Sequence, residues 1–286
     1  MTTSITSSTT QTIISAGGNP SALVIENGGI VSGIGKNKII NGNFAINQRA
    51  VSGTVVLAAG DYGHDRFKAG AAGCTYTFAT LENITTITIS AGSLIQVIEG
   101  LNLFSGNVVL SWAGTAQGKI GAGAYGNSGV TGTAVGGTNL SVEFSTGTLS
   151  LVQLETGSYK SAFEHRPYGM ELSLCQRYYE VLPDLSGSGS IIATIAMGQA
   201  TSTTTATCEL FFAPKRDLPS FTFSGSLRVS NVNGGFLTVT NISFSSISPT
   251  SAAANITVAS GLAAGNALSF GRISNSLGII EIDAEL

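Results

Sequence analysis

Residue types that commonly carry chemistry are few in this chain. It has two histidines, and His64 lies between Asp61 and Asp65 in the segment DYGHDRF. A histidine next to two carboxylates is suited to metal binding or to acid–base chemistry. A loop salt bridge with the neighbouring Arg66 is the more ordinary use of such a cluster, and we favour it. The segment is therefore expected to be structural.

The three cysteines are far apart in the sequence and odd in number. That arrangement is neither a disulfide framework nor a zinc pattern, so it predicts small buried side chains at Cys74, Cys175 and Cys208. A nucleophile–base pair of Cys175 with His165 would need direct hydrogen-bond reach. A Pro-Tyr-Gly turn and a predicted helix separate the two residues, and nothing in their spacing favours such a pair.

One glycine-rich run matches a nucleotide-binding pattern without its context. Residues 121–126, GAGAYG, fit G-x-G-x-x-G, but the following NSGVTGTAVGG cannot begin the helix that would hold a pyrophosphate. We interpret the run as a loop. The 16 acidic residues show no clustering that would favour a pair of facing catalytic carboxylates. The sequence therefore predicts no catalytic residues, no metal, no cofactor and no enzymatic activity.

The composition predicts an all-β protein. Charged residues make up only 10% of the chain, and 37 glycines accompany abundant Ser, Thr and Asn, which suits short strands and tight turns. A net charge of −3 argues against nucleic-acid binding, and no stretch predicts insertion into a membrane. The N-terminus lacks a signal-peptide pattern, so we expect synthesis in the cytoplasm. So little charge on a protein surface favours burial in an oligomer.

Clusters of turn-forming residues divide the chain into four segments. Residues 1–36 hold two short strand-like runs, which are too few to enclose a core. Residues 37–165 alternate β runs with turns about every 8–12 residues, which predicts a sandwich or jelly roll. Residues 166–189 are a helix and linker, and residues 190–286 form a second, smaller sandwich.

The one predicted helix covers residues 166–182, with Pro167 near its start and Pro183 just past its end. Met170, Leu174 and Tyr178 recur at every fourth residue and form an apolar stripe. Two interpretations stay open: the stripe covers the core of one domain, or it packs against symmetry mates.

Two stretches resemble a known family. KIINGNFAINQRA (38–50) with DYGHDRF (61–67) resembles the opening of a jelly-roll module of bacteriophage tail fibre and tail proteins, with Phe67 in place of the usual Trp. LVQLETGSYKSAFEHRPYGMELSLCQRYYE (151–180) resembles the second hallmark of that module, a strand followed by Phe-Glu-x-Arg and a helix. In addition, residues 22–37 are similar to the short β-prism segments near the base of many fibres, and the final IDAEL resembles the close of such fibres.

This resemblance implies a tail fibre or receptor-binding protein of the virion. Such proteins are usually homotrimers fixed to tail or baseplate proteins by the N-terminus, here residues 1–36, and the jelly roll resembles carbohydrate-binding modules. We therefore expect attachment to a host surface glycan, such as lipopolysaccharide. The alternatives are a tailspike-type enzyme that degrades polysaccharide, and a purely structural spacer or decoration protein.

The receptor-binding residues are predicted at the tip of the C-terminal sandwich, farthest from the N-terminal anchor. Loops on a rigid sandwich often carry binding residues, although ordinary solvated turns are an equal alternative. The candidates come from two loops, 213–220 and 231–236, and are Lys215, Arg216, Asp217, Asn231, Asn233 and Phe236.

Overall fold

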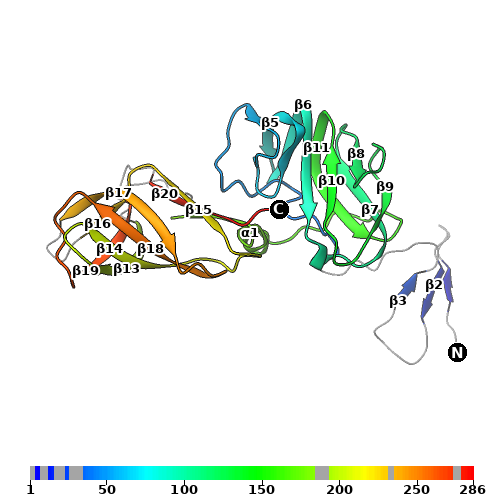
Figure 1. Ribbon diagram of the computed structural model, residues 1–286. Coiled ribbons are helices and arrows are strands. Elements are labelled where there is room, and N and C mark those ends of the chain that lie inside the picture. The colour runs from blue at the N-terminus through cyan, green and yellow to red at the C-terminus, as the bar shows by residue number, and fades with distance from the viewer. Residues whose placement is uncertain are drawn as a thin grey trace. The chain divides into compact units, whose positions relative to one another are not determined.

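The chain is all-β apart from one short helix, and it divides into two compact units (Figure 1). The computed structural model describes residues 35–183, 193–230, 235–272 and 278–286, and the backbone of three short strands before them. Unit 1 comprises Met1–Asn47 and Val51–Tyr168, and unit 2 comprises Gln48–Ala50 and Gly169–Leu286. The all-β prediction is thereby confirmed.

The three N-terminal strands pair in sequence order as an antiparallel sheet: β1 (Ser4–Thr6), β2 (Thr12–Ser15) and β3 (Leu23–Ile25). β2 and β3 fall within the two strand-like runs expected at 11–15 and 22–26. The predicted anchoring and interdigitation of residues 1–36 rests on side chains outside the described residues, and it stays a prediction.

Eight strands of unit 1 enclose one hydrophobic core, in an arrangement consistent with a jelly roll. One layer follows the order β4-β5-β6-β10-β8, and the other follows β11-β7-β9. The strands are β4 (Val55–Leu57), β5 (Lys68–Leu81), β6 (Ile84–Ile98), β7 (Gly106–Ala113), β8 (Gly118–Ile120), β9 (Val130–Ala134), β10 (Leu140–Phe144) and β11 (Gly147–Thr156), with a 3-10 turn, η1, at Gly100–Asn102.

Strand β11 joins the two layers of unit 1. Its first part, from Gly147 to Leu149, pairs with β6, and its second part pairs with β7. The partner changes between Leu149 and Ser150, and a bulge follows between Ser150 and Gln153 in the pairing with β7, where Leu151 has a φ of 51°. A bulge bends a strand and increases its twist, which is how one strand can leave a sheet and enter the next.

Alternation along the strands creates the core of unit 1. Inward residues of both layers meet there, as in the edge-to-face contact of Trp112 with Phe144, whose ring centroids are 5.3 Å apart. Cys74 is also part of this core and is 3% exposed. Many of the outward residues between these positions stay partly exposed, and the outer faces of the layers are available for function.

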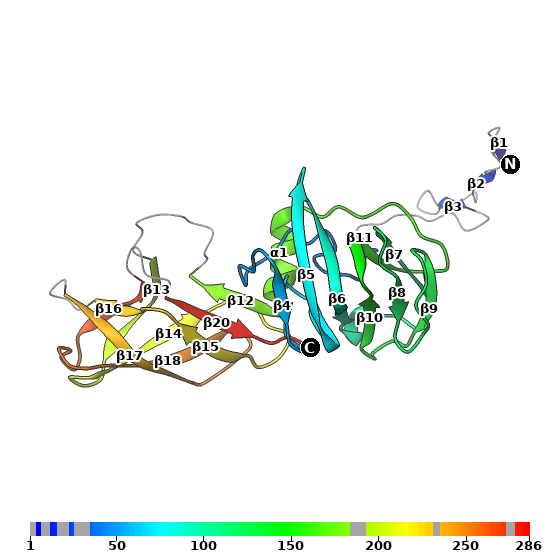
Figure 2. The ribbon, with the colours of Figure 1, turned by 90° about the horizontal axis from the view of Figure 1, so that it is seen from above.

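Unit 2 contains a closed barrel with the strand order β13-β14-β18-β17-β16-β19 and a three-stranded sheet, β12-β20-β15 (Figure 2). We expected a second, smaller sandwich; the six strands β13-β14-β18-β17-β16-β19 close into a barrel, which removes exposed sheet edges. The strands are β12 (Tyr179–Leu182), β13 (Ala193–Ala200), β14 (Thr205–Phe211), β15 (Ser220–Ser224), β16 (Arg228–Ser230), β17 (Phe236–Ser245), β18 (Ser251–Val258), β19 (Ala267–Arg272) and β20 (Ile279–Asp283).

The helix is shorter than expected. α1 spans Tyr168–Gln176, and the residues after it, predicted as helix to 182, form β12, which pairs with β20. Tyrosine and valine suit strands, and pairing with β20 supplies the hydrogen bonds that a longer helix would have made. Among the described residues, no helix is long and apolar enough to cross a membrane.

The predicted apolar stripe of the helix is not continuous. Met170 is 46% exposed, Leu174 is half-buried, and Tyr178 lies beyond the helix and is buried within unit 2 itself. The buried side chains of α1 are those of Glu171 and Cys175. Tyr178 therefore cannot serve as a contact with a symmetry mate, whereas Met170 is accessible for one.

Candidate functional site

A row of six outward side chains crosses one layer of unit 1. Strand register places Lys68 of β5 and Glu143 of β10 on either side of Ile95 of β6, and Lys119 of β8 lies opposite Glu143. Residues directly opposite each other in antiparallel strands share one face of the sheet. Their neighbours along each strand point into the core, so these four side chains lie together on the outer face.

A tyrosine stands at each end of this row. Tyr62 forms a β-bridge with Lys68, and the bridge of Gly118 with Gly126 brings Tyr125 opposite Lys119. The ammonium nitrogen of Lys68 lies 5.7 Å from the centroid of the Tyr62 ring, and that of Lys119 lies 4.9 Å from the Tyr125 ring. Both distances suit cation–π attraction.

We call the set Tyr62, Lys68, Ile95, Glu143, Lys119 and Tyr125 the aromatic row. Five strand spacings separate its two ends, a span of about 24 Å. The row combines two aromatic rings, two ammonium groups and one carboxylate on a surface built from strands.

Charge pairing holds the centre of the row rigid. The Glu143 carboxylate accepts hydrogen bonds from Lys119 Nζ at 2.8 Å and from Ser93 Oγ at 2.7 Å. Partial burial acts to raise the pKa of Glu143, but the hydrogen bonds from Lys119, Ser93 and Tyr125 outweigh burial and hold that pKa below its ordinary value. Burial, and then the hydrogen bond and charge of Glu143, raise the pKa of Tyr125 to about 12. At neutral pH the row therefore presents a carboxylate and a protonated phenol.

A glycine leaves room for this pairing. Gly70 lies on β5 beside the row, and a Cβ there would meet Ser93 Oγ at 2.0 Å and Glu143 Oε1 at 3.4 Å. Any larger residue would displace the serine that holds the carboxylate. Residues 69–73, AGAAG, lie at an irregularity in the pairing of β5 with β6, and Gly70 among them leaves space for the site.

Hydrogen bonds of Asn37 and Arg166 join the two hallmark stretches, and we call this set of contacts the latch. Asn37, which is 4% exposed, accepts hydrogen bonds from the backbone N–H groups of Ile39 and Leu154, and its amide donates to the carbonyl of Val152 at 3.1 Å. Arg166 donates to the carbonyls of Asn37 and Ile39. The start of the module is thus tied to the strand and segment that close it.

Carboxylates extend the latch along residues 157–167, between β11 and α1, which we call the closing segment. Glu164 accepts from the backbone N–H of Asn37 at 2.8 Å, and its own N–H donates to Gln153 Oε1 at 2.8 Å. Glu155, which is 2% exposed, accepts from Ser161 and lies 3.8 Å from Lys36 Nζ. These polar groups satisfy one another, as buried groups must, so the hallmark residues hold the fold.

The DYGHDRF segment is also structural. His64 is 2% exposed, and its Nδ1 lies 3.0 Å from the hydroxyl of Tyr76, which also accepts the backbone N–H of His64. Asp65 and Arg66 are buried, and Arg66 donates to the carbonyl of Val97. Burial lowers the pKa of His64 to about 4. A neutral, enclosed imidazole of this kind packs the core and has no access to a substrate.

The cysteines are buried, as predicted. Cys74, Cys175 and Cys208 are free thiols that are at most 3% exposed. Burial raises the pKa of Cys74 to about 11 and that of Cys208 to about 12. Cys175 is fully buried in unit 2, whereas His165 belongs to unit 1 and packs its ring on Phe163 at 4.9 Å. In the described part of the chain, no group of three or more His, Cys, Asp or Glu residues could hold a metal ion.

One predicted receptor contact, Lys215, does not face solvent. It is 3% exposed, and its ammonium donates to Glu180 Oε2 at 2.6 Å, to the carbonyl of Gln176 at 2.7 Å and to that of Ala213 at 3.1 Å. Burial lowers the pKa of Lys215, and the hydrogen bond and charge of Glu180 act against that shift. All three donors are used within unit 2, so Lys215 ties the end of α1 to the barrel.

The other predicted contacts do not form one site. Arg216 donates to the carbonyl of Ala284 at 2.7 Å, while the Asp217 side chain is 68% exposed and Phe236 is 44% exposed. The 213–220 loop lies beside the end of β17, because Lys215 N–H donates to the carbonyl of Pro249. Phe236 begins the same strand, about 30 Å away for nine residue rises. Asn231 and Asn233 lie outside the described residues.

Comparison with known proteins adds no assignment. No protein-family model matches the chain, and no curated protein is similar to it at a significant level.

Sequence reasoning missed the aromatic row. Its members occur in four separate stretches, and from the sequence Tyr125 is interpreted only as part of a glycine-rich loop. Outward polar positions in predicted strands were the available signal. The register that aligns them depends on which strands pair, and alternation alone does not reveal that.

Proposed function

We propose that this chain is a tail fibre subunit of a bacteriophage that attaches the virion to a host surface glycan through the aromatic row. The observation that carries the proposal is the placement of Tyr62 and Tyr125 at the two ends of one strand-built surface, with charged and hydroxyl groups between them. Aromatic faces cover the apolar side of a sugar ring, and ammonium, carboxylate and hydroxyl groups pair with its hydroxyls.

The assignment to a phage fibre is supported by the hallmark stretches. Arg166 donates to the carbonyl of Ile39, and the N–H of Val152 donates to the carbonyl of Gly42, so the two stretches together close unit 1. A flat, open surface binds weakly by itself. Three copies in a trimer, and several fibres on a virion, would raise the retention of the virion through multivalency.

The test is retention on an array of immobilised bacterial surface polysaccharides, including lipopolysaccharide and capsule. The double variant Tyr62→Ala/Tyr125→Ala is expected to bind at least about tenfold more weakly, since each ring contributes on the order of 1 kcal/mol. Tyr168→Ala is the matched control, because that tyrosine is 63% exposed and belongs to α1. Near-UV circular dichroism checks that each variant is folded.

Three outcomes would contradict the proposal. Equal retention of the double variant and the control would show that the aromatic row does not contribute to glycan binding. Release of reducing sugar from a bound polysaccharide would favour the tailspike-type enzyme. Binding to no polysaccharide, by protein that assembles normally, would favour a spacer or decoration protein.

A further inference from the structure

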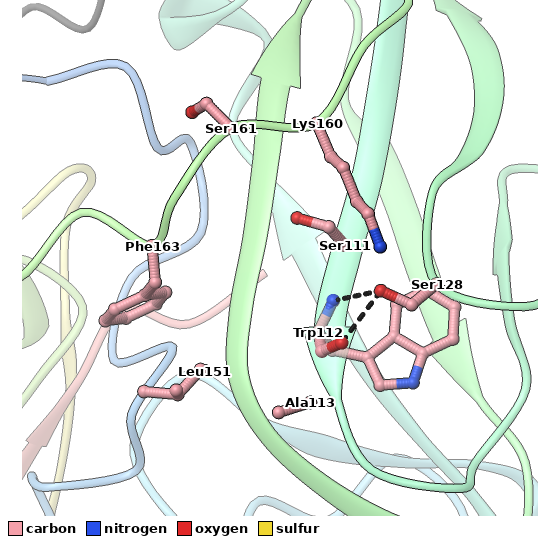
Figure 3. Close-up of a pocket in the computed structure, with 8 residues that line it drawn as sticks. All are labelled: Ser111, Trp112, Ala113, Ser128, Leu151, Lys160, Ser161 and Phe163. Carbon is pink, nitrogen blue, oxygen red and sulfur yellow. Dashed lines mark hydrogen bonds between the residues drawn. The ribbon is translucent and has the colours of Figure 1, made fainter. Parts of the chain in front are cut away.

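A second candidate site lies on the opposite layer of unit 1, away from the aromatic row. It is a pocket of about 400 Å³ between the outer face of β7 and β11 and the closing segment (Figure 3). Its lining residues are Ser111, Trp112, Ala113, Ser128, Leu151, Lys160, Ser161 and Phe163. A volume of this order accommodates a small ligand.

The bulge in β11 helps to form this pocket. Leu151, at the bulge, lines one side, and the closing segment returns over the sheet to place Lys160, Ser161 and Phe163 above it. Ser161 is held by Glu155, and Phe163 is held by its edge-to-face contact with His165. The walls are therefore fixed by the same latch that closes the module.

Lys160 is the unusual member of the lining. Among the six lysines, all within the described ranges, it is the one for which the structure has no hydrogen bond, ion pair or ring contact. Its side chain extends toward Ser111 and Ser128 (Figure 3). Lys160 is exposed at the mouth of the pocket, and its ammonium, aimed over two hydroxyls, is available to pair with an anionic group of a ligand.

The two serines offer different hydrogen-bonding capacity. Ser128 Oγ donates to the carbonyl of Trp112 at 2.7 Å and accepts its N–H at 2.9 Å, so it is fixed and can accept one further bond. Ser111 is 7% exposed and has no hydrogen bond among the described residues, so its hydroxyl can donate or accept. Together they suit sugar hydroxyls.

The lining carries one positive charge and no negative charge. Glu155, the nearest acidic group of the latch, is hydrogen-bonded to Ser161 and paired with Lys36. Phe163 adds an aromatic ring to the wall that the closing segment forms. A ligand with one carboxylate, several hydroxyls and an apolar ring face matches these groups.

We infer that this pocket binds an acidic sugar, a hexose ring that bears a carboxylate, with Lys160 pairing the carboxylate. The inference rests on the proposed function and deepens it, since it names the class of glycan unit that this attachment protein recognises. Binding at the pocket is separate from binding at the aromatic row, which lies on the other layer.

The experiment is calorimetric titration of the full chain with methyl β-D-glucuronide and with methyl β-D-glucoside at low salt. We expect saturable binding of the glucuronide and at least about tenfold weaker binding of the glucoside, since a hydrogen bond to a charged group is worth about that factor. Lys160→Gln should remove this preference. Ser111→Ala should weaken binding of both sugars.

Lys38→Gln is the matched control. It removes the same charge from unit 1, and Lys38 contacts only the carbonyl of Gly35 outside the pocket. It should leave the preference unchanged. Equal binding of the two glycosides, or an unchanged preference in Lys160→Gln, would overturn the inference. Competition by inorganic phosphate as strong as that by the glucuronide would also overturn it, because the pocket would then be a simple anion site.

Failure of this inference is distinguishable from failure of the proposed function. If polysaccharide retention still depends on Tyr62 and Tyr125 while the glucuronide does not bind, only the pocket assignment is wrong. If the glucuronide binds through Lys160 but no polysaccharide is retained through the aromatic row, the pocket stands and the attachment surface is wrong.

Discussion

At the scale of single residues, chemically versatile side chains are used to build the fold. The imidazole of His64 faces the hydroxyl of Tyr76 inside unit 1, and the ammonium of Lys215 faces Glu180 inside unit 2. The Tyr76 hydroxyl accepts the backbone N–H of His64 and lies 3.0 Å from Nδ1, so it can donate its own proton to the neutral ring. These residues had seemed candidates for chemistry or binding because sequence does not reveal burial.

His64 makes the stability of unit 1 depend on pH. The unfolded chain takes up a proton at an ordinary histidine pKa of 6.5, whereas the folded pKa is about 4. The unfolded state therefore binds more protons between these values, so the free energy of unfolding falls as the pH is lowered through this window, by up to about 3 kcal/mol. Urea unfolding followed by the fluorescence of Trp112, the single tryptophan, measures this in unit 1.

The matched pair of variants is His64→Gln and His165→Gln. The first should be less stable at pH 7 and should show a shallower loss of stability between pH 6.5 and 4.5. His165 is exposed and lies outside the core of unit 1, so its replacement is the control for exchanging a histidine for a glutamine. If the free energy of unfolding of His64→Gln depends on pH as steeply as that of the unaltered chain, groups other than His64 cause the pH dependence.

At the scale of elements, the latch depends on a close backbone approach. Gly42, in the Asn-Gly-Asn-Phe stretch, accepts the N–H of Val152 at 2.7 Å, and a Cβ on Gly42 would lie 2.1 Å from the carbonyl oxygen of Val152. It would also lie 3.3 Å from the ring of Phe163. Only glycine lets the opening segment lie this close to β11, which explains the residue at this position.

Gly42→Ala should therefore lower the free energy of unfolding of unit 1 by about 2 kcal/mol or more, since backbone must move to admit the methyl group. Urea unfolding followed by Trp112 fluorescence checks this. Gly169→Ala is the control, because a Cβ there meets no atom within 4 Å. That change in α1 should be neutral or stabilising. Equal stability of Gly42→Ala and the unaltered chain would show that the latch is not as tight as described.

At the scale of the whole molecule, the surface favours association. Unit 1 exposes Leu101, Phe104 and Val135 by 82%, 76% and 58%, in a chain with 10% charged residues. Apolar side chains on a surface with little charge promote assembly. The homotrimer, which the resemblance to tail fibres implies, stays a prediction.

Native mass spectrometry of the full chain should show three copies of the 29.1 kDa subunit. If α1 packs against symmetry mates, Met170→Asp should shift the protein to monomer, because a charge would be buried at the contact. Met197→Asp is the control, since Met197 is 74% exposed on the barrel. A stable monomer of the unaltered chain at micromolar concentration would refute the trimer.

The sequence by itself determined the all-β class and the position of many strands, because alternation is local. The run Leu140–Phe144 coincides with β10, and Thr54–Ala58 contains β4. Short strands with weaker patterns were missed, such as β9, which contains Gly132. Burial of the three cysteines also followed from residue type alone.

Only the tertiary structure decided which residues act together. The sequence predicts a helix at Tyr179 and its neighbours, but pairing with β20 makes this segment a strand. It predicts a surface charge at Lys215, but Glu180 and Gln176 enclose that side chain. Tyr62 and Tyr125 are 63 positions apart, yet pairing through four intervening strands places them in one row. Each outcome depends on contacts between distant segments, and the free energy of such a contact is set by both partners.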